Sequence, residues 1–489
     1  MTSARMSADV PDVLVIGGGL AGLLAARRHL AAGARVTLLE AGPDPGGAIA
    51  RRDVAGIPLS SGAEAYAIGG GATDELIAQL GLADAVVSPR PGLGSRVVSA
   101  AGSHRAPTPA LLGIPAHPLA ADSRAVLGWP GALRAGLERF LPASFGMRPG
   151  VSIGELVARR CGTRVARRLL APVVGGVHSA DPGTLELAAA SPPLAAGLAA
   201  HGSLTAAVRH LRAAGSRSAG ANVRSLMPTM AALPEALVAG IRAAGGELRT
   251  GAPVTELRFA AGRWSARTVA GEHHDADRIV LACPPDVCVT LLGTPAPGIA
   301  AAIPSAPAAA VRLVALAVDA PALDALPSGT GALVAPGTPG VRAKALTHAS
   351  AKWEHVAAAA RAAHPGAASP HVMRLSYGRP GEQLPDPESI VDLALADASA
   401  ILGVPVSRTQ LLGSAVIDWE RAMRQPGPGH RAALDHLTDL LAQAPPGSPA
   451  SALELVGSWR AGTGIDAIVR ADRSLPRPLT ESPTEGSPS

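Results

Sequence analysis

Three glycines and one glutamate near the amino terminus have the spacing of a nucleotide-binding turn. Gly17, Gly19 and Gly22 form G-x-G-x-x-G, and Glu40 follows 18 residues after the last of them. In such a unit the first glycine permits a tight turn, the second lets the backbone approach a pyrophosphate, and the third lets the helix pack on the strand. A carboxylate after the second strand can accept hydrogen bonds from ribose hydroxyls. The pattern therefore predicts a dinucleotide site.

The sequence on both sides of the turn predicts the elements that must position these residues. "DVLVIG" is typical of a short buried strand, "LAGLLAARRHLAAG" of a helix and "ARVTLLE" of a second strand. The glycines interrupt the apolar run early, and Arg27 and Arg28 place two charges inside it, which argues against an export signal and a membrane span. We expect a strand–turn–helix–strand unit over residues 12–40.

Composition limits the remaining classes of function. The chain of 489 residues is 47% apolar and 17% charged, which predicts a globular protein of two or three domains. The net charge of +5 is small for this length and no long run of like charge occurs, which argues against nucleic-acid binding. Cys161, Cys283 and Cys288 lack metal-ligand spacing, so we expect buried thiols, a cytoplasmic location and no metal.

A second group of glycines narrows the choice of dinucleotide. Gly46 and Gly47 follow Glu40, and Gly62 comes after them. This arrangement resembles the extended signature of the glutathione-reductase-type flavoproteins of the amine-oxidase superfamily. The resemblance implies FAD, with Gly46 and Gly47 near the adenosine side and residues 62–65 near the flavin ring.

Four later stretches resemble elements of the porphyrinogen oxidases within that superfamily. They are "LLAPVVGGVHSADPGTLEL" (169–187), "KALTHASAKWEH" (344–355), "WERAMRQPGPGH" (419–430) and "GSWRAGTGID" (457–466). The resemblance implies the FAD-dependent, six-electron oxidation of coproporphyrinogen III to coproporphyrin III in haem biosynthesis, with O2 as acceptor and H2O2 as a product. It also implies an α/β fold with a Rossmann-like FAD domain, an α+β substrate domain and a helical insertion.

The same resemblance orders these parts along the chain. We expect the FAD domain over 1–75, 223–300 and 413–473, the substrate domain over 76–100 and 301–412, the helical insertion over 101–222, and a disordered tail over 474–489. The family's final helix is shortened in this sequence by "VRADRSLPRP", so we expect its dipole to be weak.

The site residues implied by the resemblance fall into two sets, and no catalytic acid or base is assigned. The expected FAD contacts are Gly17, Gly18, Gly19, Leu20, Ala21, Gly22, Glu40, Ala41, Gly46, Gly47, Gly62, Ala63, Glu64, Ala65, Val254, Trp419, Thr463, Gly464 and Ile465. Substrate propionates require cations, and the candidates are Lys344, Lys352, Arg421 and Arg424. The two lysines are the only ones in the chain. Trp353, Trp419 and Trp459 are candidates for packing on a ring, with core packing as the alternative.

Three alternatives to this function stay open. Protoporphyrinogen IX is a rival substrate on the same fold. A flavin amine oxidase is a rival enzyme, with Trp419, Trp459 and Lys344 around an amine. A non-enzymatic relative similar to the GDP-dissociation inhibitors is the third, although the intact glycine turn and Glu40 argue against loss of the flavin. A monomer or a homodimer and a peripheral membrane contact by the 100–222 region are also open.

Overall fold

The computed structural model describes most of the chain. The described residues are 10–148, 150–177, 179–187, 191–213, 223–305, 308–424, 427 and 429–475. The tail expected to be disordered therefore lies outside the described residues from position 476 onward, as do residues 214–222.

A five-stranded parallel sheet forms the half of the molecule that contains the predicted glycine turn. Its order is β12-β2-β1-β16-β22. The strands are β1 (Asp12–Ile16), β2 (Arg35–Leu39), β12 (Glu247–Arg249), β16 (Arg278–Leu281) and β22 (Leu453–Leu455). β1 lies between β2 and β16, with Leu14 beside Thr37 and Ile279. The strand–turn–helix–strand prediction is confirmed, because helix α1 (Leu20–Ala31) connects β1 to β2.

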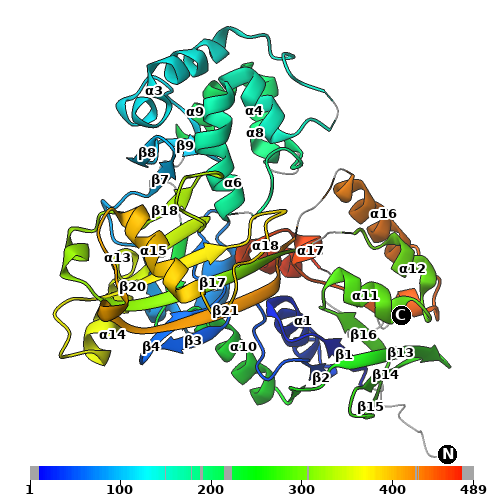
Figure 1. Cartoon of the computed structure of the whole chain (residues 1–489). Coiled ribbons are helices and arrows are strands. Elements are labelled where there is room, and N and C mark those ends of the chain that lie inside the picture. The colour runs from blue at the N-terminus through cyan, green and yellow to red at the C-terminus, as the bar shows by residue number, and fades with distance from the viewer. Residues whose placement is uncertain are drawn as a thin grey trace, which may run out of the picture.

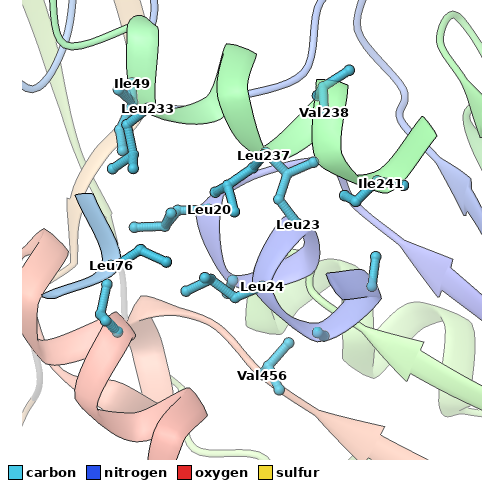
Figure 2. Packing of buried hydrophobic residues seen from close by; sticks show 14 of the residues in the cluster. Leu20, Leu23, Leu24, Ile49, Leu76, Leu233, Leu237, Val238, Ile241 and Val456 are labelled. Carbon is cyan, nitrogen blue, oxygen red and sulfur yellow. The ribbon is translucent and has the colours of Figure 1, made fainter. Parts of the chain in front are cut away.

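Apolar packing fixes α1 on almost every side. Figure 2 shows Leu20, Leu23 and Leu24 of α1 among side chains from α10 (Ala232–Ala243) and α2 (Ala72–Gln79). Leu23 is fully buried, and Ala25 and Ala26 beside it are as well. Each large buried apolar side chain of this kind contributes about 1.5–3 kcal/mol to stability. The turn before α1 is therefore attached to a rigid element.

A seven-stranded sheet forms the second half, in the order β21-β17-β20-β19-β18-β7-β8. Its strands are β21 (Leu411–Arg424), β17 (Ala308–Asp319), β20 (Pro370–Tyr377), β19 (Ala345–His348), β18 (Gly331–Val334), β7 (Arg96–Ser99) and β8 (Gly102–Arg105). Three helices pack against it, namely α13 (Ala349–Lys352), α14 (Glu354–Ala363) and α15 (Ile390–Leu402). Figure 1 shows this sheet beside the parallel sheet, with α18 and α17 near their junction.

The two sheets divide the chain at positions that differ from the expected boundaries. The second half of α2, which follows the expected boundary at 75, contributes Leu76 and Ile77 to the apolar cluster around α1. β21 continues the seven-stranded sheet to Arg424, past the expected boundary at 412. The hairpin of β3 (Arg51–Val54) and β4 (Ile57–Ser60) packs its Ile57 with Ala317 of the seven-stranded sheet. Tertiary packing, which local sequence patterns do not encode, decides these positions.

The segment expected to be a helical insertion is largely helical. It contains α3 (Ala121–Gly136), η2 (Leu137–Phe140), α4 (Ile153–Cys161), α5 (Thr163–Val165), η3 (Ala166–Leu170), α6 (Ala171–Val177), α8 (Pro192–His201) and α9 (Leu204–Ala213). These helices gather at one end of the molecule, and α6 leads back to β18 (Figure 1). A buried ion pair between Arg160 and Glu138 lies in its core.

Further strands and helices complete the fold. They are β5 (Tyr66–Ala67), β11 (Val223–Leu226) and β6 (Val86–Val87) in one sheet, β13 (Val254–Ala260), β14 (Arg263–Thr268) and β15 (His273–Ala276) in another, β9 (Ala110–Leu111) with β10 (Ile114–Pro115), and the helices α11 (Pro285–Leu292), α12 (Pro297–Ala302), α16 (His430–Ala442), α17 (Ser458–Ala461) and α18 (Ile465–Ser474). Within the described ranges, no helix has both the length and the apolar character required to cross a bilayer.

Candidate FAD site

The first glycine turn is sterically closed to larger residues. Gly17 has φ +105°, and a Cβ there would lie 3.0 Å from the carbonyl oxygen of Ala282 in the neighbouring strand segment. A Cβ on Gly22 would lie 1.9 Å from the carbonyl oxygen of Gly17. The turn can therefore form only with glycine at both positions, and it brings the start of α1 directly against the end of β1.

At the start of α1, backbone amides have no hydrogen-bond acceptor within the helix. Gly19 is the N-cap and has no side chain to accept from the first turn, and the first helical bond runs from the Leu23 amide to the Gly19 carbonyl at 3.0 Å. The amides of Leu20 and Ala21 precede that bond and therefore have no intrahelical acceptor. No atom lies within 4 Å of a Cβ placed on Gly19. Open space in front of uncapped amides fits a pyrophosphate.

Glu40 lies beside this turn. Its carboxylate accepts the Gly18 amide at 2.6 Å and the Gly42 amide at 2.7 Å. Its backbone accepts the amide of Ala252 at 2.9 Å, so the strand that begins at Val254 starts nearby. The sequence-predicted FAD contacts Glu40, Gly18 and Val254 therefore gather in one region.

The second glycine pair connects the turn to the segment expected near the flavin ring. The Gly46 amide donates to the carbonyl of Gly18 at 2.8 Å. Two residues after Gly46, the carbonyl of Ala48 accepts the Ala63 amide at 2.8 Å, and a Cβ on Gly62 would approach that oxygen to 2.1 Å. Three glycine segments are thus packed backbone to backbone.

Trp419 closes the far side of this segment. Its indole Nε1 donates to the carbonyl of Ser61 at 2.9 Å. A Cβ on Gly62 would lie 3.0 Å from its ring. Trp419 therefore packs against the backbone of residues 61–62, where sequence reasoning expects the flavin ring.

Glu64 is held by two cations and an indole. Lys352 Nζ and Trp353 Nε1 each donate to its Oε1 at 2.7 Å, and an Arg374 guanidinium nitrogen donates to Oε2 at 3.0 Å. Burial opposes ionisation of this carboxyl, but the charges of Lys352 and Arg374 outweigh burial and lower the pKa of Glu64 to about 2. Arg374 also donates to the carbonyl of Ser60 at 2.8 Å, so the ion pairs fix the path of residues 60–64.

The carboxyl-terminal turn returns to the parallel sheet. The Val456 amide donates to the carbonyl of Leu281 in β16 at 3.0 Å, and β16 is the neighbour of β1. Thr463 and Gly464 are exposed, and Gly464, with φ +113°, is the N-cap of α18 and provides no side-chain cap. The backbone amides at the start of α18 are thus uncapped. This positive end of the helix dipole would stabilise a flavin carbonyl oxygen that gains negative charge.

The expectation of a weak final helix needs correction. α18 runs for ten residues and includes the "VRADRS" segment that was expected to shorten it. Ten residues is an ordinary helix length, and the dipole acts mainly through the first turn.

The candidate substrate cations are dispersed and engaged with protein groups. Lys344 is 1% exposed and donates to Ser179 Oγ at 2.6 Å and to the Gly378 carbonyl at 2.8 Å. Burial lowers its pKa to about 8. Arg421 and Arg424 both approach the carboxylate of Asp286, at 3.0 and 3.9 Å. Lys352 is the partner of Glu64 described above.

Two of the three tryptophans singled out from the sequence are core residues. Trp353 is 1% exposed and Trp459 is 4% exposed. Trp459 packs in the apolar cluster of β16 and α11. The core-packing alternative holds for these two, whereas Trp419 is half-buried beside the glycine segment.

Sequence reasoning missed two charged residues at this site. Arg374 interrupts the apolar strand "HVMRLSYG", and a lone arginine in such a strand is a signal of a buried partner. Asp466, directly after the predicted contact Ile465, is 7% exposed and accepts from Thr73. Neither partner could be inferred from local spacing.

Comparison with known proteins also indicates a flavoprotein. The family described as flavin containing amine oxidoreductase matches residues 20–471. The chain is 31% identical over 481 residues to the coproporphyrinogen III oxidase of Mycobacterium leprae, covering 94% of this chain and 95% of that one. It is 30% identical to the protein of the same name from Mycobacterium tuberculosis H37Rv, with 94% of each chain covered.

Solved structures show the same fold. A crystal structure from Exiguobacterium named for protoporphyrinogen oxidase aligns with a TM-score of 0.79 at 22% identity, over 95% of this chain and 97% of that one. Cyclohexylamine oxidase from Brevibacterium oxydans aligns over 95% of this chain and 97% of its own with a TM-score of 0.63 at 17% identity. The fold is therefore shared by porphyrinogen and amine oxidases and does not by itself choose the substrate.

Proposed function

The chain belongs to the flavin-containing amine oxidoreductase family, and from that premise we propose that it oxidises coproporphyrinogen III to coproporphyrin III, with O2 as the final electron acceptor. Family membership confirms the predicted fold class and the flavin cofactor. The observation that carries the substrate is the identity of about 30%, over nearly the whole chain, to proteins named coproporphyrinogen III oxidase. Overall, one porphyrinogen and three O2 would give one porphyrin and three H2O2, because six electrons leave the macrocycle.

The proposed FAD contacts follow the chain of glycine segments described above. The amides at the start of α1 would hold the pyrophosphate, Glu40 the adenosine ribose, and residues 62–65, Trp419 and 463–465 the isoalloxazine. When bound, FAD supplies the hydride acceptor. Because Glu64 uses its carboxylate for Lys352 and Arg374, we expect its contribution to FAD to come from the backbone.

A surplus positive charge beside Glu64 supports an anionic substrate. The single carboxylate of Glu64 is shared by Lys352 and Arg374. This group keeps an excess of one cation. Lys344, the remaining candidate, donates to a hydroxyl and to a carbonyl. Propionates of a porphyrinogen are the complementary groups.

The amine-oxidase alternative receives less support. It requires Trp419, Trp459 and Lys344 around one amine, but Trp459 is enclosed in an apolar cluster and Lys344 donates to Ser179 of the helical segment. An ammonium lysine beside an amine substrate is also unfavourable by charge.

The proposal is tested by anaerobic bleaching of the flavin. Purified holoprotein is mixed with coproporphyrinogen III, protoporphyrinogen IX or a monoamine, and the flavin absorbance is followed. We expect coproporphyrinogen III to bleach it fastest, and readmitted O2 to yield coproporphyrin fluorescence with three H2O2 per porphyrin. Faster bleaching by protoporphyrinogen IX would make that compound the proposed substrate. Bleaching by the monoamine alone would make the protein an amine oxidase.

We also propose that the outer end of the helical segment contacts an anionic membrane surface. Trp129, Leu133, Leu137 and Phe140 follow one another along α3 and η2 with exposures of 59%, 53%, 56% and 68%. The opposite side of α3 is buried through small residues such as Ala132. A large apolar stripe exposed to water is typical of an interaction surface.

The charge around this stripe favours lipid headgroups. Arg124 lies over the Trp129 ring at 4.4 Å and Arg139 over the Phe140 ring at 4.5 Å. Both arginines therefore place a positive charge directly beside an exposed aromatic ring of the stripe. Aromatic side chains flanked by arginines are suited to an anionic interface. Figure 1 shows α3 at the end of the molecule remote from α1 and β1.

Vesicle sedimentation tests this contact. We expect the holoprotein to sediment with phosphatidylglycerol-containing vesicles, and binding to fall at least about tenfold in a Trp129→Ser/Leu133→Ser/Phe140→Ser variant. Val269→Ser, which changes a side chain 68% exposed outside this segment, is the matched control. Equal binding of variant and wild type would exclude the contact. A dimer that dissociates in the triple variant, without vesicle binding, would assign the stripe to a second copy.

A cytoplasmic location is part of the proposal. Cys161, Cys283 and Cys288 are free and buried, and free thiols are typical of a reducing compartment.

A further inference from the structure

A buried carboxylate lies in the first turn of the helix proposed to face the flavin ring. Asp466 is 7% exposed, and its Oδ1 accepts the Thr73 amide at 3.2 Å and the Thr73 hydroxyl at 3.1 Å. Its Oδ2 pairs with Arg470 Nε at 2.9 Å. The two bonds to Thr73 join residues 393 positions apart in the chain.

This contact joins the starts of two helices. Thr73 is the second residue of α2, whose N-cap Gly71 has no side chain to satisfy the first amides. Asp466 therefore acts as the missing cap of α2, although it belongs to α18. A Cβ on Gly70 would lie 2.1 Å from Asp466 Oδ2, so the backbone before α2 passes directly against this carboxylate.

The other end of α18 is fixed to the helix proposed to bind the pyrophosphate. Arg28 of α1 donates through Nε to Asp472 at 3.1 Å, and it also pairs with Glu454 of β22. Burial raises the pKa of Asp472, and the Arg28 charge opposes that rise. α18 is thus attached to α2 by its first turn and to α1 by its last turn.

We infer that Asp466 is a positioning residue for the flavin, because it ties the first turn of α18, whose uncapped amides are proposed to face the ring, to the start of α2. Apart from this contact, the first turn of α18 is held by the buried side chain of Ile465, and the last turn is held to α2 by the pair of Arg473 with Glu75. The inference rests on the proposed FAD contacts at 463–465 and is independent of which substrate is oxidised.

Two substitutions separate position from charge. Asp466→Asn keeps an oxygen that can accept from Thr73 but removes the negative charge, whereas Asp466→Ala removes both. Thr73→Val removes one of the two bonds while the carboxylate and the Thr73 amide remain, and Thr73→Ser restores the hydroxyl. Asp435→Ala is the matched control, because Asp435 forms the same i,i+4 pair with arginine on α16 but is 60% exposed.

The measurements are the FAD dissociation constant of the apoprotein and the visible circular dichroism of the bound flavin. We expect Asp466→Ala to raise the dissociation constant about tenfold or more and to alter the dichroism, since this variant loses both hydrogen bonds to Thr73. We expect Asp466→Asn and Thr73→Ser to stay within about threefold of wild type and Asp435→Ala to match it.

Two results would overturn the inference. One is wild-type FAD affinity and dichroism in Asp466→Ala. The other is an equal loss in Asp466→Asn and Asp466→Ala, which would make the charge, and not the position, decisive. If Asp466→Ala does not fold, the FAD dissociation constants of Thr73→Val and Thr73→Ser are compared instead. Equal constants for these two variants would then overturn the inference. A negative porphyrinogen assay leaves these binding measurements unaffected.

Discussion

The two ends of the proposed FAD site are built from different interactions. At the pyrophosphate end, Gly17 and Gly22 make backbone contacts too close for any side chain, and α1 behind them is enclosed by apolar residues. At the flavin-ring end, Glu64 and Asp466 hold the backbone through ion pairs and hydrogen bonds. The first end depends on shape and the second on charge, so they should fail under different perturbations.

The largest effect should come from filling the first glycine turn. Gly22→Val places a Cβ at a position 1.9 Å from the Gly17 carbonyl oxygen and adds two methyl groups beyond it. We expect the FAD content of purified protein to fall below about a tenth of wild type, because the turn cannot form. The ratio of flavin to protein absorbance measures this. Gly69→Ala, where no atom lies within 4 Å of the added Cβ, should retain FAD; FAD retention by both variants would contradict the steric argument.

The apolar support of the same end can be tested separately. Leu24 is 3% exposed within the cluster around α1 (Figure 2). We expect Leu24→Ala to lower the free energy of unfolding by about 2–5 kcal/mol. Leu133→Ala, on the exposed stripe of α3, should change it by less than about 0.5 kcal/mol. Denaturant unfolding of both variants measures these changes. If Leu24→Ala lowers the free energy of unfolding as little as Leu133→Ala does, α1 is not held by this packing.

Acid should weaken the flavin-ring end selectively. Because the pKa of Glu64 falls from 4.5 to about 2 on folding, its contribution is present above pH 4.5 and is lost as the pH drops toward 2. The contribution is on the order of 3 kcal/mol. We expect the difference in unfolding free energy between wild type and Glu64→Gln to be largest at pH 7 and to narrow below pH 4.5.

An exposed ion pair serves as the control for that acid titration. Glu247 pairs with Arg249 at 2.7 Å, and both side chains are more than two-fifths exposed. Glu247→Gln should leave the acid response equal to that of wild type. A constant difference between wild type and Glu64→Gln from pH 7 to pH 3 would show that the Glu64 charge does not stabilise the fold.

This contrast also explains how much the sequence could predict. The glycine turn, β1, α1 and β2 were predicted correctly because their signals lie within about thirty consecutive residues and depend on local geometry. The partners of Glu64 are Lys352 and Arg374, 288 and 310 residues away, and Asp466 meets Thr73 across 393 residues. Local periodicity carries no information on such pairs, so the pairing of Lys352 with Glu64 could not be predicted from the sequence.

The smallest of these effects is expected at Glu40, where the two kinds of interaction meet. Its carboxylate accepts the Gly18 and Gly42 amides through different oxygens, so it both shapes the turn and supplies charge. Glu40→Gln retains one acceptor oxygen and loses the other, which costs one charge-assisted hydrogen bond of about 1.5 kcal/mol. We therefore expect the FAD dissociation constant to rise roughly tenfold, with the flavin dichroism of the bound form unchanged because the ring end is intact. An altered dichroism in Glu40→Gln would show that the two ends are coupled and that the division by shape and charge is too simple.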